Sequence, residues 1–362
     1  MKYLFILGNN PELSVAEITA ILPQAKILKK TQLYLAVDSP KIDCQRLMDR
    51  LGGTIKIGLV LGAHPDVGPI TGSAMSKSGG RFNFGLSFYG QKPSNWGLGI
   101  KKQLKGQGIS SRLVTSREPA LSSVIITKEK CQDYIITPEF FAQTCAVQDF
   151  KEFGKRDFGR PAADAYSGML PPKAAKMMIN LSGAQTTATV LDPFCGSGTI
   201  LSEALALGYT DLIGTDLSDK AVADSQKNLQ WLAEELKIKD YKLKIEKLDV
   251  RELSKNFDSV DAIITEPYLG KPIRGNENAE QIKSIIAELS DLYLSAFRQF
   301  KKVLAENGKI VMIFPEWHLH GKIYRLNISE RVSQLGFKRL DSGDLYYKRE
   351  DQKVWRNITI WQ

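Results

Sequence analysis

The sequence predicts a mixed α/β protein whose C-terminal half is built on a largely parallel sheet. Two observations support this prediction. From residue 189 onward, short apolar runs of strand length alternate with longer stretches that have the apolar period of helices. Such alternation is typical of a parallel sheet with helices on both faces. Before residue 150, strand-like and helix-like segments follow in mixed order, which indicates smaller α+β units.

In the C-terminal half, strands are expected at five apolar runs: residues 189–191, 212–214, 244–248, 262–264 and 310–314. An apolar helix is expected over residues 199–207, and a long amphipathic helix carries apolar residues from Ile282 to Phe297. The closing segments Tyr346-Tyr347 and Val354–Trp361 predict an antiparallel hairpin. Such hairpins commonly form the edge of a mixed sheet.

The chain is therefore expected to have three regions. Residues 1–58 predict a small α+β unit that includes a helix from Ser14 to Leu22. Residues 59–150 predict a second such unit, and residues 151–362 hold a linker and the parallel sheet.

The second region contains a Gly/Ser-rich stretch from Thr71 to Gly80, which is expected to be a mobile or ligand-facing loop. A basic helix is expected around residues 99–105. Strands are expected at residues 112–114 and 124–126.

The composition excludes several classes of protein. No apolar run approaches the ~20 residues that span a bilayer, and the apolar opening Met1–Leu7 reads as a strand rather than a signal peptide. The cysteines stand singly, and the three histidines are scattered. Neither a disulfide nor a metal site is expected, and a reducing cytoplasmic location fits best. The four cysteines are Cys44, Cys131, Cys145 and Cys195.

The chain is basic, with a formal net charge of +9. Lysine and arginine near phosphates release condensed counterions, so this balance favours a polyanionic partner such as nucleic acid. Many basic proteins use such a charge only to stay in solution. Charge alone therefore leaves both interpretations open.

A glycine loop from Asp192 to Thr199 follows the first strand of the predicted sheet. In such folds, ligands bind beyond the carboxyl ends of the strands, where the strand order reverses. Gly196 and Gly198 permit a tight turn and close approach of the backbone to a ligand. We expect this loop, with Phe194 and the Asp192 carboxylate, to contact a cofactor.

Acidic residues after the next two strands indicate which cofactor this is. Asp216 follows the glycines by about 20 residues, where an acid accepts hydrogen bonds from ribose hydroxyls. Asp249 is placed to accept from an adenine amine, and Leu217 and Val250 lie beside these acids. Leu201 replaces the third glycine of a dinucleotide fingerprint, and no P-loop is present. The pattern favours S-adenosylmethionine over a nicotinamide cofactor.

The segment Thr265-Glu266-Pro267-Tyr268 after the fourth strand resembles the Asp/Asn-Pro-Pro-Tyr motif of amino-methyltransferases. In that family, side-chain and backbone oxygens accept hydrogen bonds from the target amine while the aromatic ring stacks on the extruded base. Pro267 and Tyr268 match the motif, whereas Thr265 and Glu266 replace its first two residues. The resemblance implies that the Thr265 hydroxyl and the Glu266 backbone carbonyl orient the amine.

Nearly the whole chain resembles the THUMP-domain tRNA guanine-N2 methyltransferases, which act on guanosine at tRNA position ten. The resemblance rests on residues 3–8, 11–14 and 17–18, on residues 84–90 with the helix 101–105, and on residues 156–161, 168–173 and 178–181. It implies a Rossmann-like class I methyltransferase domain preceded by a ferredoxin-like unit and an RNA-gripping THUMP unit. Basic residues are the candidates for phosphate contact, although each alone is more often a solvated charge. They are Lys101, Lys102, Lys105, Arg112, Arg117, Lys271 and Arg274.

The sequence thus predicts N2-methylation of a tRNA guanosine. Two alternatives remain open: a DNA amino-methyltransferase, and a non-catalytic RNA-binding protein that has kept the fold. The sequence leaves open the modified nucleotide, the number of methyl groups, the oligomeric state and the effect of Thr265 and Glu266 on activity.

Overall fold

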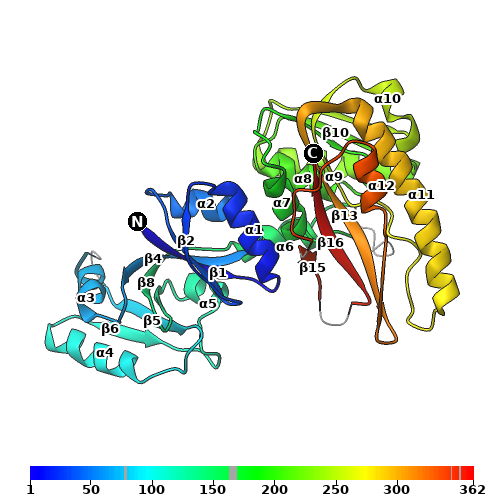
Figure 1. Ribbon diagram of the computed structural model, residues 1–362. Helices are drawn as coiled ribbons and strands as arrows, with labels where there is room; N and C mark the ends of the chain where they lie inside the picture. The colour runs from blue at the N-terminus through cyan, green and yellow to red at the C-terminus, as the bar shows by residue number, and fades with distance from the viewer. Residues whose placement is uncertain (77–79, 163–168, 344, 350–351) are drawn as a thin grey trace. The chain divides into compact units, whose positions relative to one another are not determined.

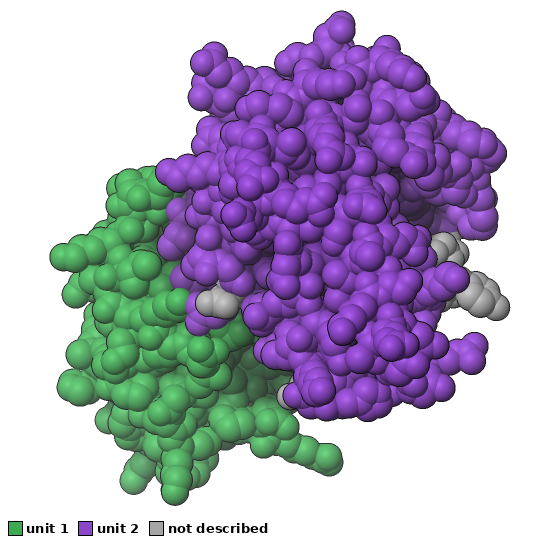
Figure 2. Space-filling model, turned by 45° about the vertical axis from the view of Figure 1, so that its right-hand side comes forward, with its two compact units in different colours: residues 1–11, 22–151 green, residues 12–21, 152–362 purple. Residues whose placement is uncertain are grey.

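The computed structural model describes residues 1–76, 80–162, 169–343, 345–349 and 352–362. The chain separates into two compact units, coloured separately in Figure 2. Unit 1 comprises residues 1–11 and 22–151, and unit 2 comprises residues 12–21 and 152–362.

Unit 1 contains a single eight-stranded sheet with the order β2-β3-β1-β4-β8-β7-β5-β6 (Figure 1). Strand β4 pairs with β1 on one side and with β8 on the other. The expected boundary at residue 58 falls inside this strand, so one sheet runs through both predicted N-terminal regions. The strands are β1 (Lys2–Leu7), β2 (Lys26–Lys30), β3 (Tyr34–Asp38), β4 (Thr54–Gly62), β5 (Phe82–Phe88), β6 (Ser111–Val114), β7 (Gln132–Ile136) and β8 (Phe141–Val147).

Two segments of unit 1 differ from their expected structure. Much of the Gly/Ser-rich stretch lies in a helix, because Ile70 and Ala74 are one turn apart and bury a common apolar face; residues 77–79 of the stretch lie outside the described residues. The run expected as a strand at 124–126 belongs to a helix capped by the Ser122 hydroxyl. The helices of this unit are α2 (Cys44–Arg50), α3 (Val67–Ser76), α4 (Trp96–Gly106) and α5 (Ser123–Lys128).

The structure contradicts the expectation that no disulfide forms. Cys44, at the start of α2, is bonded to Cys145 on β8, with a Cα–Cα distance of 5.9 Å. The two cysteines are separated by 101 residues. Their pairing follows from the packing of α2 on β8, which sequence spacing does not reveal. The argument from single cysteines to a reducing compartment loses its support.

A fully buried ion pair lies at the centre of unit 1. Lys56 Nζ lies 2.8 Å from Asp133 Oδ2, and both side chains have no exposed surface. The Ser87 and Thr144 hydroxyls donate hydrogen bonds to the same carboxylate at 2.6 and 2.9 Å. These side chains connect β4, β5, β7 and β8 through the Asp133 carboxylate, which has three hydrogen-bond partners.

Unit 2 contains a second eight-stranded sheet with the order β11-β10-β9-β12-β13-β16-β15, in which β14 pairs with β13. Strands β9 to β13 run parallel, whereas β16 is antiparallel to β13 and β15 is antiparallel to β16. The predicted fold class and its antiparallel edge are confirmed. The strands are β9 (Thr189–Asp192), β10 (Asp211–Asp216), β11 (Lys242–Lys247), β12 (Val260–Thr265), β13 (Leu304–Leu319), β14 (Lys322–Arg325), β15 (Tyr346–Tyr347) and β16 (Val354–Trp361).

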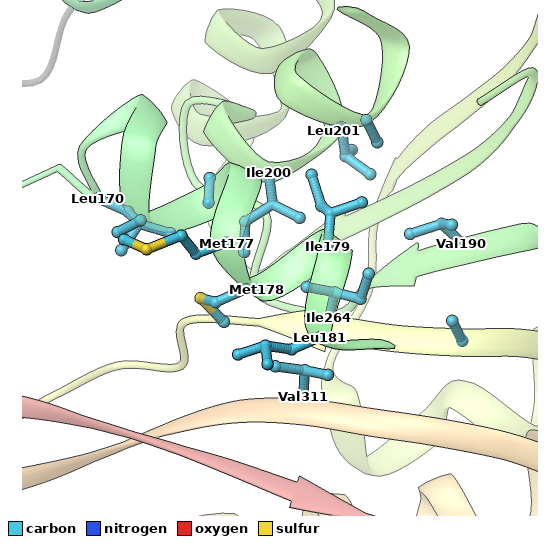
Figure 3. Packing of buried hydrophobic residues seen from close by; sticks show 14 of the residues in the cluster. Leu170, Met177, Met178, Ile179, Leu181, Val190, Ile200, Leu201, Ile264 and Val311 are labelled. Atoms are coloured by element: carbon cyan, nitrogen blue, oxygen red, sulfur yellow. The ribbon is translucent and has the colours of Figure 1, made fainter. Parts of the chain in front are cut away.

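Helices cover both faces of this sheet. On one face, α7 and α8 pack their apolar residues against β9, β12 and β13 (Figure 3). On the other, α11 packs against Ile263, Met312 and Phe314. The helices are α1 (Pro11–Ile21), α6 (Phe150–Phe158), α7 (Pro172–Ser182), α8 (Thr199–Ala206), α9 (Asp219–Leu236), η1 (Val250–Glu252), α10 (Leu253–Asn256), α11 (Ala279–Val303) and α12 (Ser329–Gln334).

Helix α1 joins the core of unit 2, although the sequence places it next to β1. Leu13 is buried in the cluster around α7. Asn180 Nδ2 donates a hydrogen bond to Glu17 Oε1 at 2.7 Å, and both groups are buried. Apolar burial and a buried polar contact therefore hold residues 12–21 to this unit. Within the described residues, no helix combines the length and the apolarity that crossing a bilayer requires.

Candidate active site

The glycine loop joins the last residue of β9, Asp192, to the first residue of α8, Thr199. Gly196 and Gly198 have φ angles of +51° and +83°, a region that favours glycine. A Cβ atom at Gly198 would lie 2.4 Å from Ser225 Oγ, so this glycine allows α9 to pack closely. A Cβ atom at Gly196 would meet nothing within 4 Å. The loop therefore closes against α9 at one glycine and leaves space at the other.

The structure brings Asp216 against this loop. Asp216 ends β10, and its Oδ2 accepts a hydrogen bond from the Gly196 amide at 3.0 Å. Its Oδ1 accepts from the Ser218 amide at 2.9 Å. The neighbouring Leu217 exposes 59% of its surface. An acceptor and an exposed apolar side chain thus stand together beside the open glycine.

Asp249 lies two residues beyond the end of β11, the neighbour of β10. Its Oδ1 accepts a hydrogen bond from the Arg251 amide at 2.9 Å, and its carboxylate pairs with the Arg251 guanidinium. Arg251 lowers the pKa of Asp249. The next residue, Val250, is buried. This acid is at the expected strand end, but a ligand amine would have to share it with Arg251.

Asp192 is buried at the C-terminal end of the inner strand β9 and has a strongly perturbed pKa. The Thr265 hydroxyl donates to Asp192 Oδ1 at 2.7 Å, and the Phe194 amide donates to the same oxygen at 3.2 Å. The pKa of Asp192 is raised to about 7, chiefly by burial and also by the charges of Asp216 and Glu266, against the lowering effect of those hydrogen bonds. Closely spaced acids disfavour an anionic ligand and favour a cationic one.

These residues fit S-adenosylmethionine. Its adenosine needs acceptors and an apolar surface, which Asp216, Asp249 and exposed Leu217 offer. Its sulfonium and ammonium groups carry positive charge, which the acids at the ends of β9 and β10 favour. Among the described residues, no three His, Cys, Asp or Glu side chains gather in a way that could hold a metal ion.

The structure buries Thr265 completely. This residue ends β12 opposite Met312 of β13, has 0% exposed surface, and gives its hydroxyl hydrogen to Asp192. Its expected role requires a hydroxyl that faces the target base. In the structure, Thr265 instead supports Asp192 from inside the sheet.

Glu266 is the first residue beyond β12, and an arginine that the sequence did not suggest holds its side chain. Arg356 Nε, from β16, donates a hydrogen bond to Glu266 Oε1 at 2.5 Å. Burial raises the pKa of Glu266, and the charge of Arg356 and its hydrogen bond oppose that rise. The two residues are 90 positions apart. Only the strand order brings them together.

Pro267 is buried, whereas Tyr268 exposes 47% of its surface. The Tyr293 hydroxyl, from α11, donates a hydrogen bond to the Tyr268 carbonyl at 3.0 Å and fixes the backbone there. Burial raises the pKa of Tyr268, and Glu288 adds to this effect. An exposed aromatic ring therefore stands two residues beyond Glu266, where a base could stack on it.

The basic residues fall on both units. In unit 1, Lys101, Lys102 and Lys105 are exposed on α4, near exposed Trp96. Arg117 is exposed, whereas Arg112 pairs with Glu129 at 2.8 Å. In unit 2, exposed Lys271 and Arg274 follow Tyr268 within six residues, and the Arg274 carbonyl accepts a hydrogen bond from Lys353.

Comparison with known proteins gives two matching family models. The model described as RMKL-like, methyltransferase domain, matches residues 160–343. A model described as DNA methylase matches residues 90–227, a stretch that includes parts of both units. The first of these covers the glycine loop, all three acids and the Tyr268 segment.

Curated relatives are guanine-N2 methyltransferases. The chain is 35% identical over 170 residues to the tRNA (guanine(10)-N2)-dimethyltransferase of Methanothermobacter thermautotrophicus, a match that covers 46% of each protein. It is 26% identical over 369 residues to the enzyme of that name from Pyrococcus abyssi, covering 100% of this chain and 99% of the relative. The human U6 snRNA (guanine-N(2))-methyltransferase THUMPD2 is 34% identical over 143 residues, covering 39% and 24%. The match spans about half the length of the first relative.

Solved structures share the fold. TrmN from Thermus thermophilus has a TM-score of 0.51 at 18% identity and covers 100% of this chain and 99% of its own. A putative methyltransferase solved in complex with SAH has a TM-score of 0.50 at 13% identity and covers 98% and 97%. At these identities the likeness concerns the fold alone.

Proposed function

This chain belongs to the family of RMKL-like methyltransferase domains, and from that membership we propose that it methylates the N2 amine of a guanosine in tRNA, at position ten. S-adenosylmethionine is the cofactor. One observation carries the proposal: exposed Tyr268 lies two residues beyond Glu266 at the end of β12, next to β9 with its buried Asp192 carboxylate, at the strand ends where the sheet order reverses. The names of the relatives support guanine and tRNA as the substrate class.

The cofactor supplies an electrophilic methyl group on a cationic sulfonium. Asp216 would accept hydrogen bonds from its ribose hydroxyls, and Asp249 would accept one from its adenine amine. The glycine loop between Phe194 and Thr199 would pass close to it, with Leu217 and Val250 providing apolar surface. The negative charge of Asp192 would favour a positively charged group nearby.

The chain's own residues would prepare the guanine amine. The lone pair of an exocyclic amine is delocalised into the ring, so acceptors that hold its hydrogens out of the plane make it a better nucleophile. We assign this role to the Glu266 carboxylate together with its backbone carbonyl. Thr265 would act from behind through Asp192, Pro267 would fix the turn, and Tyr268 would stack on the extruded base, returning part of its unstacking cost.

The RNA itself would be held by its phosphates. Lys271 and Arg274 would contact phosphates near the target nucleotide. The residues of unit 1 would contribute a basic surface elsewhere on the RNA: Lys101, Lys102, Lys105, Arg112 and Arg117. Because the substrate is tRNA, we also propose a cytoplasmic location.

The test is methyl transfer from labelled cofactor to tRNA, followed by digestion to nucleosides. Label in N2-methylguanosine or N2,N2-dimethylguanosine is the expected result. Label in N6-methyladenosine would overturn the guanine assignment. Duplex DNA serves as the competing substrate, because a DNA methylase model also matches the chain; preferential labelling of DNA would overturn tRNA as the substrate.

A further inference from the structure

Arg356 reaches the target site from the antiparallel edge of the sheet. It lies on β16 opposite Pro315 of β13, one strand beyond the neighbour of β12. Its guanidinium nevertheless contacts Glu266 at the end of β12, at 2.5 Å. The Arg356 side chain exposes 9% of its surface and that of Glu266 15%, so water screens this ion pair weakly.

The surroundings of Glu266 do not otherwise favour its charge. Burial is the main cause that raises the pKa of Asp192 on β9, and the charge of Glu266 adds to that rise, so each carboxylate disfavours the ionised form of the other. Tyr293 on α11 is a buried phenol whose pKa is raised by burial and by the charge of Glu266, so it offers that carboxylate no positive charge. Among the described groups that act on Glu266, Arg356 is the positive one. Without it, a buried carboxylate beside another acid would take up a proton.

The two oxygens of Glu266 are used differently. Oε1 accepts the hydrogen bond from Arg356 Nε, whereas Oε2 accepts none from the described residues. Glu266 occupies the position of the motif's first proline, and its side chain has one more rotatable bond than the Asp or Asn that precedes that proline, so holding its carboxylate in one position costs more conformational entropy. A planar guanidinium that grips one oxygen restricts the other.

We propose that Arg356 is a positioning residue for methyl transfer: it keeps Glu266 ionised and leaves Oε2 to accept a hydrogen bond from the target amine. This inference rests on the proposed function. It also explains how the acceptor role can pass from the first position of the motif, where Thr265 stands, to Glu266 at the second, because an anchor on a distant strand holds the glutamate side chain.

The test compares Arg356→Met, which removes the charge, with Arg356→Lys, which keeps it. The rate of guanosine N2-methylation is measured against pH with saturating cofactor and tRNA. Glu266 works ionised, so loss of the cation raises its pKa and moves the acid limb of the profile to higher pH, by about one to two units. Arg356→Lys should keep the limb near that of the native chain. Cofactor affinity, measured by calorimetry, should change less than about twofold in both variants.

Arg325→Met is the matched control. Arg325 is the guanidinium partner of another buried carboxylate in unit 2, Glu316, and its loss should leave the limb in place. An unmoved limb in Arg356→Met, or a rate lowered equally at every pH, would overturn the inference alone. If Arg356→Met does not fold, Arg356→Gln takes its place with the same expectation. A native chain that methylates no tRNA guanosine would overturn the proposed function as well.

Discussion

Two buried aspartates, one in each unit, show how differently this chain treats charge. Asp133 in unit 1 receives Lys56 at 2.8 Å and two hydroxyl hydrogen bonds. Asp192 in unit 2 receives one hydroxyl, from Thr265, and one backbone amide, and no described cation pairs with it. The first carboxylate has its charge balanced within the protein. The second is buried with negative neighbours, and its pKa is raised to about 7.

The difference separates a structural carboxylate from one that is available to a ligand. A balanced, saturated buried pair holds elements together and has little left to offer a ligand. An acid whose burial is only partly compensated is costly for folding, and such groups concentrate at functional sites. The partial compensation of the Asp192 charge therefore indicates a ligand site at this residue, independently of any sequence motif.

The largest expected effect comes from breaking the balanced pair. Lys56→Met leaves Asp133 buried without its cation, and we expect a loss of about 3–5 kcal/mol in the free energy of unfolding of unit 1. Denaturant unfolding followed by circular dichroism measures this. Lys101→Met, at an exposed position on α4, should change stability by less than about 0.5 kcal/mol. Equal stability of the two variants would show that Asp133 is not a structural centre.

A smaller effect is expected for Asp216, the acid to which we assign cofactor binding. Asp216→Ala removes the acceptor that lies against Gly196, and we expect S-adenosylmethionine to bind more weakly by about 2–3 kcal/mol, or roughly 30- to 150-fold. Calorimetric titration measures the affinity. Asp219→Ala, three residues further on and 80% exposed at its side chain, is the control and should bind as the native chain does. If both variants bind equally well, Asp216 does not hold the cofactor.

The sequence predicted local features of the site and missed the distant ones. The Gly196–Asp216 pair could be predicted because a glycine turn and the acid at the next strand end occur at a characteristic spacing. The Arg356–Glu266 contact was not, because it depends on β16 inserting next to β13, and no local pattern reports strand order. The burial of Thr265 follows from strand register, which the motif alone does not fix.

The same reasoning explains the errors in the fold. The Cys44–Cys145 bond joins residues 101 positions apart, so it required the order of unit 1's sheet. The glycines and serines of residues 71–80 predict a loop, whereas the buried pair Ile70 and Ala74 stabilises helix α3 over part of that stretch. Parallel strands and amphipathic helices were predictable because their periodicity is local.

The smallest expected effect concerns the charge of Asp192, which its hydrogen-bond partners compensate only in part. Its pKa is raised from 3.8 to about 7, so the folded chain binds a proton more tightly than the unfolded chain. Stability from this group is fully present below about pH 4 and is lost as pH rises to about 7. The cationic cofactor prefers the ionised form of Asp192, so the affinity for the cofactor should instead rise through about pH 7, and Asp192→Asn should abolish that dependence.

Thr265→Val removes the hydroxyl that lowers the pKa of Asp192, while Thr265→Ser retains it. With Thr265→Val the midpoint of binding should therefore move to higher pH by somewhat less than one unit, equivalent to about 1 kcal/mol, and with Thr265→Ser it should stay. If the midpoint of binding is unchanged in both Thr265 variants, another group titrates, and Asp192, like Asp133, does not interact with the ligand.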